Sequence, residues 1–100
     1  MTKYILERSP IKGKKWRITT PSGKKISFGQ LGYEDYTTHK DRKRKQLYLK
    51  RNFPRQDWTA KGIDTAGFWA RHLLWNLTTI DESIKSIERM FGIDIVRRKN

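Results

Sequence analysis

Hydrophobic and polar residues alternate early in the chain, as they do in strands with one buried face. Within residues 14–20, Trp16 and Ile18 fall on one side of an extended chain, with polar residues between them. Ile26 and Phe28 resume the same alternation after a break. We therefore predict two neighbouring strands that share one apolar face.

The break between these two runs has the composition of a tight turn. It reads Pro21-Ser22-Gly23-Lys24, in which proline presets the first φ angle and glycine accepts the positive φ that follows. The two strands are thus predicted to form a β-hairpin. A short β-prone run over residues 4–7, closed by Ser9-Pro10, extends the hairpin to a three-stranded meander.

Three helices are predicted after residue 37. The first starts near His39 behind a cap at Thr38, with Asp41 in its first turn, and ends at Asn52-Phe53-Pro54 because the residue before proline leaves the α region. The second, over residues 66–75, follows a cap at Asp64 or Thr65. Apolar residues cover most of its circumference, so we expect it to form the centre of the core.

The third predicted helix begins with a capping box, Thr79 at the cap and Glu82 three residues later. Its apolar residues follow at helical spacing, and Gly92 is a natural C-terminal cap. These residues are Ile80, Ile84, Ile87 and Phe91. Residues 93–96 favour a last short strand.

Strands followed by helices are typical of the α+β class. We predict a single basic domain over residues 1–100. Its N-terminal antiparallel hairpin, or three-stranded meander, precedes about three helices packed on one face of the sheet.

The charge of the chain restricts its function further. Lys and Arg total 23 against 10 acidic residues, which gives a net charge of +13. Such a domain concentrates on anionic surfaces, whether nucleic acid, acidic protein or membrane. No apolar run reaches the roughly 20 residues of a transmembrane span, and the N-terminus lacks the apolar core of a signal peptide. With no cysteine, we expect an intracellular setting without disulfides or thiolate-bound metal.

Basic residues gather most densely in the first predicted helix, with seven cations and one acid between residues 39 and 51. The partner acids of an ordinary exposed helix are missing, which favours a helix that docks on a polyanion. A merely solubilising face is the alternative. The candidate residues are Lys40, Arg42, Lys43, Arg44, Lys45, Lys50 and Arg51, with Lys24 and Lys25 of the hairpin turn in support.

Two further basic clusters occur, and the sequence leaves open whether the three share one face. One lies in the hairpin and the other is the tail Arg97-Arg98-Lys99. The hairpin cluster comprises Lys12, Lys14, Lys15, Arg17, Lys24 and Lys25.

The aromatic residues are expected to build the core, because a chain this polar has few aliphatic side chains to bury. Tyr33 and Tyr36, in the loop before the basic helix, are the exceptions, as candidates for stacking on bases or for contacts with a protein partner. No base-reading pattern is present, so phosphate contacts would give affinity without sequence specificity.

Catalysis is not expected. His39 and His72 have no metal-ligand spacing. Acids in loops could hold a metal for phosphodiester cleavage, but nothing pairs them with a base or a nucleophile. They are Glu34, Asp35, Asp57 and Asp64. We therefore expect no catalytic residue, no metal, no cofactor and no small-molecule substrate.

Several segments, which together cover most of the chain, have a distinctive sequence as a set. They are Ile26–Gly29, Gly32–Asp41, Arg42–Lys45, Tyr48–Arg51, Thr65–Trp69, Leu73–Asn76, Ser83-Ile84 and Phe91–Ile93. In these segments the chain resembles a family of small, basic, uncharacterised proteins of the nucleocytoplasmic large DNA viruses, which include chlorella viruses, mimiviruses and marseilleviruses.

This resemblance implies a viral protein that is made late and packaged in the virion, after assembly in the host-cell cytoplasm or viral factory. It implies no established activity. Two partners fit such a protein. The first is double-stranded DNA of the viral genome, bound without sequence specificity. The second is the acidic face of larger capsid subunits, bridged by a minor capsid protein. Net charge favours DNA slightly.

Overall fold

The computed structural model describes residues 3–32 and 34–98. Its strands come first and its helices follow, with one strand closing the chain, so the fold is α+β as predicted. The elements are β1 (Lys3–Arg8), β2 (Lys14–Thr19), β3 (Lys25–Gln30), α1 (Tyr36–His39), α2 (Arg42–Asn52), the short turns η1 (Phe53–Arg55) and η2 (Ala60–Gly62), α3 (Ala66–Trp69), η3 (Ala70–Leu74), α4 (Ile80–Phe91) and β4 (Asp94–Arg97).

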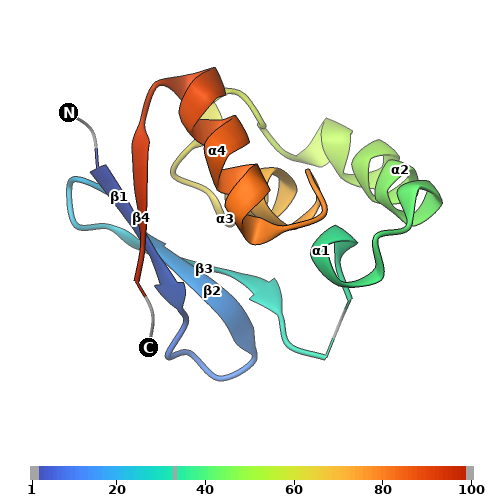
Figure 1. The fold of residues 1–100 in the computed structure, drawn as a ribbon, viewed down its shortest axis with the longest axis horizontal. Coiled ribbons are helices and arrows are strands. Elements are labelled where there is room, and N and C mark those ends of the chain that lie inside the picture. The colour runs from blue at the N-terminus through green and yellow to red at the C-terminus, as the bar shows by residue number, and fades with distance from the viewer. Residues whose placement is uncertain (1–2, 33, 99–100) are drawn as a thin grey trace.

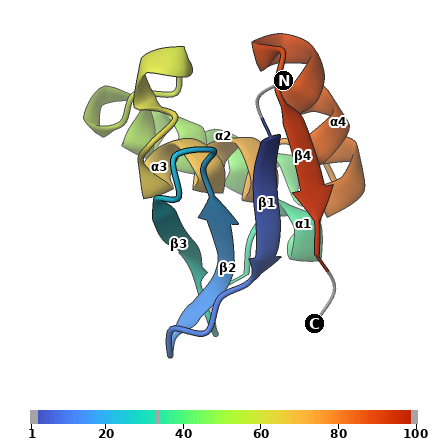
Figure 2. The ribbon, with the colours of Figure 1, turned by 90° about the vertical axis from the view of Figure 1, so that its left-hand side faces the viewer.

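The first three strands form the predicted antiparallel meander (Figure 2). In the β2–β3 hairpin, Trp16 pairs with Phe28 and Ile18 pairs with Ile26, which keeps the alternating apolar residues on one face. Gly23 takes a φ of 93° in the turn between them, as the sequence pattern requires.

The last predicted strand is confirmed as β4, but its place in the sheet was not predicted. It lies beside β1 and runs parallel to it, so the strand order is β3-β2-β1-β4 and the sheet is mixed (Figure 2). Tyr4 of β1 pairs with Ile95 of β4. Alternation within residues 93–96 indicates a strand, but nothing local to it specifies which edge of the sheet it joins.

The helices cover one face of the sheet, and the hydrophobic core lies between the two layers (Figures 1 and 2). Leu6 and Ile18 contribute from the strands and are fully buried, as are Phe68 and Trp69 of α3 and Ile87 of α4. This arrangement confirms that residues 66–75 lie at the centre of the core. Each large ring removes on the order of 150–250 Å² from water, which allows a polar chain to build a core from few residues.

The central helix has a wider turn at its C-terminal end. Thr65 caps α3, and the helix passes directly into η3, a π-helical segment in which the N–H of Trp75 donates to the carbonyl of Ala70 at 3.1 Å. Such segments are uncommon and often occur at functional sites. Here η3 carries Ala70 and Leu74 to the side of the molecule where α2 lies.

The third predicted helix is confirmed as α4. The Thr79 hydroxyl accepts from the Glu82 N–H at 3.1 Å, and Gly92 ends the helix in the left-handed conformation with a φ of 64°. The Glu82 carboxylate bonds the Thr79 hydroxyl rather than the Thr79 N–H, so only half of the predicted capping box forms.

The predicted basic helix is confirmed as α2, but it starts at Arg42 rather than near His39, and the short helix α1 precedes it. Asp35, not Thr38, caps α1, and the Thr38 hydroxyl accepts from the Asp35 N–H at 2.9 Å. Lys40 then adopts a left-handed conformation with a φ of 55°, which ends α1. Asp41 caps α2 through bonds to the N–H groups of Lys43 and Arg44. Two aspartates six residues apart each start a helix, and the chain bends between them.

Candidate anion-binding site

Helix α2 docks on the rest of the protein along a narrow seam. The residues of this seam are half-buried and recur three, four and seven residues apart, so they form one stripe along the helix. They are Lys45, Tyr48, Leu49 and Asn52. No residue of α2 is fully buried. The opposite side of the helix therefore faces solvent.

Two aromatic rings form the main contact of the seam. Tyr48 lies flat on Trp75, with ring centroids 4.2 Å apart and planes inclined by only 3°. Burial raises the pKa of the Tyr48 hydroxyl, against the smaller lowering effect of nearby Arg71 and Arg51. Trp75 and Tyr48 thus serve the packing of α2, which is the structural role that the sequence favoured for most of the tryptophans.

Lys45 belongs to the seam and not to the outward face. Its ammonium donates to the carbonyl of Asn76 at 2.5 Å and lies 4.8 Å from the centre of the Tyr36 ring. Burial lowers the pKa of Lys45, and the positive charges of Arg71 and Arg42 lower it further. Among the predicted polyanion-binding residues, Lys45 therefore holds the helix in place.

The outward side of α2 carries exposed cations without protein partners. The side chains of Arg42, Lys43 and Lys50 are exposed and make no hydrogen bond or ion pair within the described residues. The helix contains no acidic residue. Lys40, next to it, donates to the carbonyl of Thr37 at 2.9 Å. Among the predicted polyanion-binding residues, these three exposed cations, which lack a counter-charge within the described residues, are the best candidates for contact with an anion.

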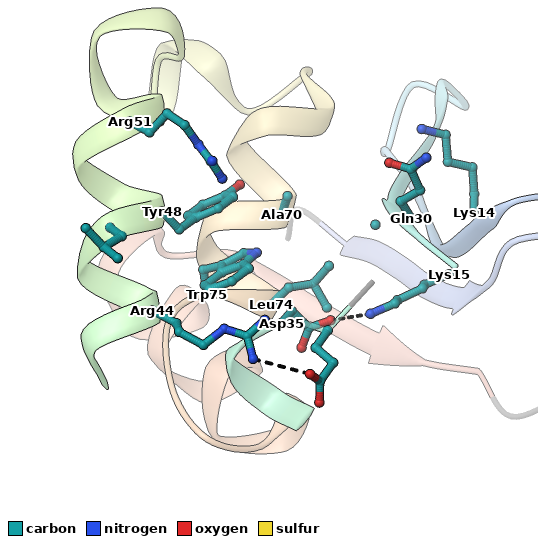
Figure 3. A pocket seen from close by; sticks show the side chains of 13 residues that line it. Lys14, Lys15, Gln30, Asp35, Arg44, Tyr48, Arg51, Ala70, Leu74 and Trp75 are labelled. Atoms are coloured by element: carbon teal, nitrogen blue, oxygen red, sulfur yellow. Dashed lines mark hydrogen bonds and ion pairs between the residues drawn. The ribbon is translucent and has the colours of Figure 1, made fainter. Parts of the chain in front are cut away.

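A groove of about 560 Å³ separates α2 from the neighbouring ends of β2 and β3 (Figure 3). Arg44 and Arg51 line it from the helix, seven residues apart and thus on one side of α2. Lys14 and Lys15 line it from β2. The groove therefore brings together residues of two basic clusters that lie thirty residues apart in the sequence.

Two of these four cations are neutralised inside the groove. The Lys15 ammonium lies 2.7 Å from the carboxylate of Asp35, which is buried, and the Arg44 guanidinium lies 3.2 Å from Glu34 (Figure 3). The two ion pairs differ in exposure. Both partners of the Arg44 pair are about half exposed, so this pair is worth at most about 1 kcal/mol.

The shape of the groove depends on a glycine. Gly29 has a φ of 77°, and a Cβ atom there would lie only 2.8 Å from Cδ1 of Leu74 and 3.2 Å from Cβ of Lys15. Any side chain at position 29 would displace Leu74, which lines the groove. Gln30, Leu74 and Trp75 also line the groove, and no sequence pattern marks them as site residues, because only the tertiary packing of η3 against β3 brings them there.

The remaining predicted site residues lie elsewhere. Lys24 and Lys25 are at the far end of the β2–β3 hairpin from Lys14, and the Lys24 ammonium donates to the carbonyl of Asp64 at 3.1 Å. Tyr36 is only 8% exposed because it begins α1 beneath Lys45, so it is buried rather than available to a partner. Tyr33 lies outside the described residues.

The basic tail lies against one end of the sheet. Arg97 of β4 and Arg8 of β1 both lie against the ring of Trp16, with guanidinium carbons 5.5 and 5.6 Å from the ring centre. Arg98 lies 3.9 Å from Glu7, whose pKa is lowered chiefly by the hydrogen bond from Arg17. The end of β1, the start of β2 and the end of β4 thus share one end of the sheet (Figure 2). Lys99 lies outside the described residues.

The loop acids act locally. Asp35 caps α1, and Glu34 pairs with Arg44. Asp57 accepts hydrogen bonds from the hydroxyl and the N–H of Thr59, and these bonds lower its pKa. Over residues 3–32 and 34–98, no group of three or more His, Asp or Glu side chains has the arrangement of a metal site. Nor does any helix of this part of the chain have the length and apolarity that crossing a membrane demands.

Part of the chain is similar to a known protein family. Residues 4–52 match a family of unknown function, DUF5754. The matched segment is just under half of the chain and runs from β1 to the last residue of α2. No curated protein and no solved structure matches the chain.

Proposed function

We propose that this protein is a non-catalytic polyanion-binding protein whose partner is double-stranded DNA, bound without sequence specificity. The observation that carries the proposal is the outward side of α2, where Arg42, Lys43 and Lys50 are exposed and have no partner within the described residues. Phosphate contacts of this kind supply most of the affinity of non-specific DNA binding. Phosphate contacts give no sequence specificity, because sequence is read at the edges of the bases.

The setting we propose is the virion of a large DNA virus, or the viral factory where virions assemble. The sequence resemblance to small basic proteins of these viruses supports it, as does the net charge of +13. A packaged genome is a dense polyanion, and a protein of this charge would screen part of its self-repulsion.

A salt titration of DNA binding tests the proposal. Fluorescence anisotropy with a labelled random duplex is measured between 50 and 200 mM NaCl, conditions in which non-specific dissociation constants are on the order of micromolar or weaker. We expect a steep linear fall of log K with log salt. The triple variant Arg42→Gln, Lys43→Gln and Lys50→Gln should reduce that slope by roughly 2–3 units, since each lost phosphate contact removes about 0.9.

A matched control separates a defined surface from overall charge. The variant Lys3→Gln, Lys85→Gln and Arg89→Gln removes the same three charges from exposed positions on β1 and α4. We expect it to leave the slope nearly unchanged. Equal loss in both variants, or binding that ignores salt, contradicts a DNA-binding surface on α2.

A second candidate is a minor capsid protein that bridges larger subunits through acidic faces. Two exposed apolar residues favour it. Leu47 is 61% exposed on α2 and Phe53 is 68% exposed just after it, beside Lys50 and Arg51. Large apolar side chains next to arginine are typical of protein interfaces. If this candidate is right, Leu47→Ser and Phe53→Ser abolish binding to capsid subunits and leave the DNA salt slope intact.

A further inference from the structure

Two cations face the groove beside α2 without neutralising partners. Arg51 extends from α2 on one side, and Lys14 extends from β2 on the other, with the Gln30 side chain beside it (Figure 3). Neither the Arg51 guanidinium nor the Lys14 ammonium makes a hydrogen bond or ion pair with any described residue. Lys15 and Arg44, by contrast, pair with Asp35 and Glu34. The excess positive charge in the groove therefore belongs to Arg51 and Lys14.

The rest of the groove is suited to a small ligand. Its volume of about 560 Å³ is in the range of small-molecule sites, roughly 300–1,000 Å³. Ala70 and Leu74 supply apolar wall. Tyr48 and Trp75, stacked on each other, add aromatic wall.

We propose that this groove binds the phosphate monoester of a small phosphorylated ligand, of the class of a nucleoside monophosphate, with the phosphate between Arg51 and Lys14. A monoester carries about two negative charges and three acceptor oxygens, which matches two cations and the Gln30 amide. The arginine fork binds two oxygens at once, and lysine acts as a point charge. The body of the ligand occupies the space beside Leu74. This site is separate from the outward side of α2, and it does not depend on duplex binding.

Titration calorimetry with adenosine 5′-monophosphate, adenosine and inorganic phosphate tests the inference. We expect the monophosphate to bind, adenosine not to bind, and phosphate to compete. The double variant Lys14→Gln and Arg51→Gln should weaken monophosphate binding by at least about tenfold, as loss of charge-assisted hydrogen bonds requires. Leu47→Glu, at an exposed position on the groove wall, should weaken it as well by like-charge repulsion.

The matched control is Lys43→Gln with Lys50→Gln. It removes two charges from the same helix at positions that do not line the groove. We expect monophosphate affinity to stay within about twofold, because solvent-exposed charges outside the site are screened by salt. Circular dichroism and thermal unfolding verify that each variant is folded. Equal loss in the control, equal binding of adenosine, or no binding of the monophosphate overturns the inference.

The same variants separate this inference from the proposed DNA binding. Loss of monophosphate binding without a change in the duplex salt slope supports a distinct groove site. A steep duplex slope in a protein that binds no monophosphate refutes the groove site alone. The source of the phosphate is resolved by competition with single-stranded oligonucleotides. If only a 5′-phosphorylated strand displaces the monophosphate, the ligand is a strand end, and if neither strand does, it is a free nucleotide.

Discussion

His72 is a buried titratable residue whose surroundings favour its neutral form. Its Nε2 lies 2.9 Å from the carbonyl of Trp58, so this nitrogen carries the proton and donates, because a carbonyl only accepts. Its Nδ1 is buried and has no hydrogen-bond partner in the part of the chain that the structure describes. The ring packs against Phe68 and Phe91, with centroids 4.5 and 5.2 Å away. Burial lowers the pKa of His72, and Arg71 lowers it further, whereas the bond to Trp58 raises it.

This lowered pKa predicts that the protein loses stability as pH falls below about 6.5, the ordinary pKa of histidine. In that range the unfolded chain binds a proton that the folded protein does not. The free energy of unfolding is therefore highest above pH 6.5 and falls by at most about 1.4 kcal/mol per pH unit until the folded pKa is reached. Urea unfolding at several pH values from 7.5 to 5 measures it. His72→Gln keeps a donor for Trp58 and should show a shallower pH dependence; identical profiles would refute the assignment.

The break between α1 and α2 is a feature of elements rather than of single contacts. Lys40 lies between the two helices with a φ of 55°, a left-handed conformation that costs a residue with a side chain about 1–2 kcal/mol. Lys40→Gly should therefore stabilise the protein by about 1 kcal/mol, because glycine adopts this conformation without the steric cost. Chemical denaturation measures the change. Lys43→Gly, inside α2, is the control and should destabilise by a similar amount. If both variants are less stable than the natural protein, the Lys40 side chain stabilises the fold by more than the strain of its backbone costs.

The same region shows how far sequence patterns reach at this scale. Alternation and turn chemistry determine the β2–β3 hairpin, so the sequence predicts its strands and its turn. The short helix α1 was missed because Thr38 and Asp35 are both good helix caps, and only packing decides between them. Asp35 is the cap because its carboxylate also pairs with Lys15, twenty residues earlier in the chain.

At the scale of the whole molecule, the sequence predicts the charge of the binding surface but not its geometry. The sequence shows that residues 40–51 are basic, but it does not show that Lys45 and Arg51 have different roles. Lys45 packs beneath the helix against Asn76, and Arg51 faces the groove, because Tyr48 docks on Trp75 and thereby fixes the rotation of α2. The stacking of Tyr48 on Trp75 thus decides that Lys45 has a structural role and that Arg51 stays accessible to a ligand.

Most cations among the described residues have no acidic partner there, which predicts an unusual salt response. Over residues 3–32 and 34–98, five ion pairs form, against a net charge of +13 for the chain. Self-repulsion therefore outweighs attraction, and raising NaCl from 50 to 500 mM shortens the screening length to a few ångströms. We expect Tm to rise by several degrees, since about 1 kcal/mol corresponds to roughly 4–8 °C in a domain of this size. The variant Arg42→Gln, Lys43→Gln and Lys50→Gln should unfold at a higher temperature in low salt and respond less to added salt. Differential scanning calorimetry measures both effects, and a Tm that falls with NaCl would show that the ion pairs dominate.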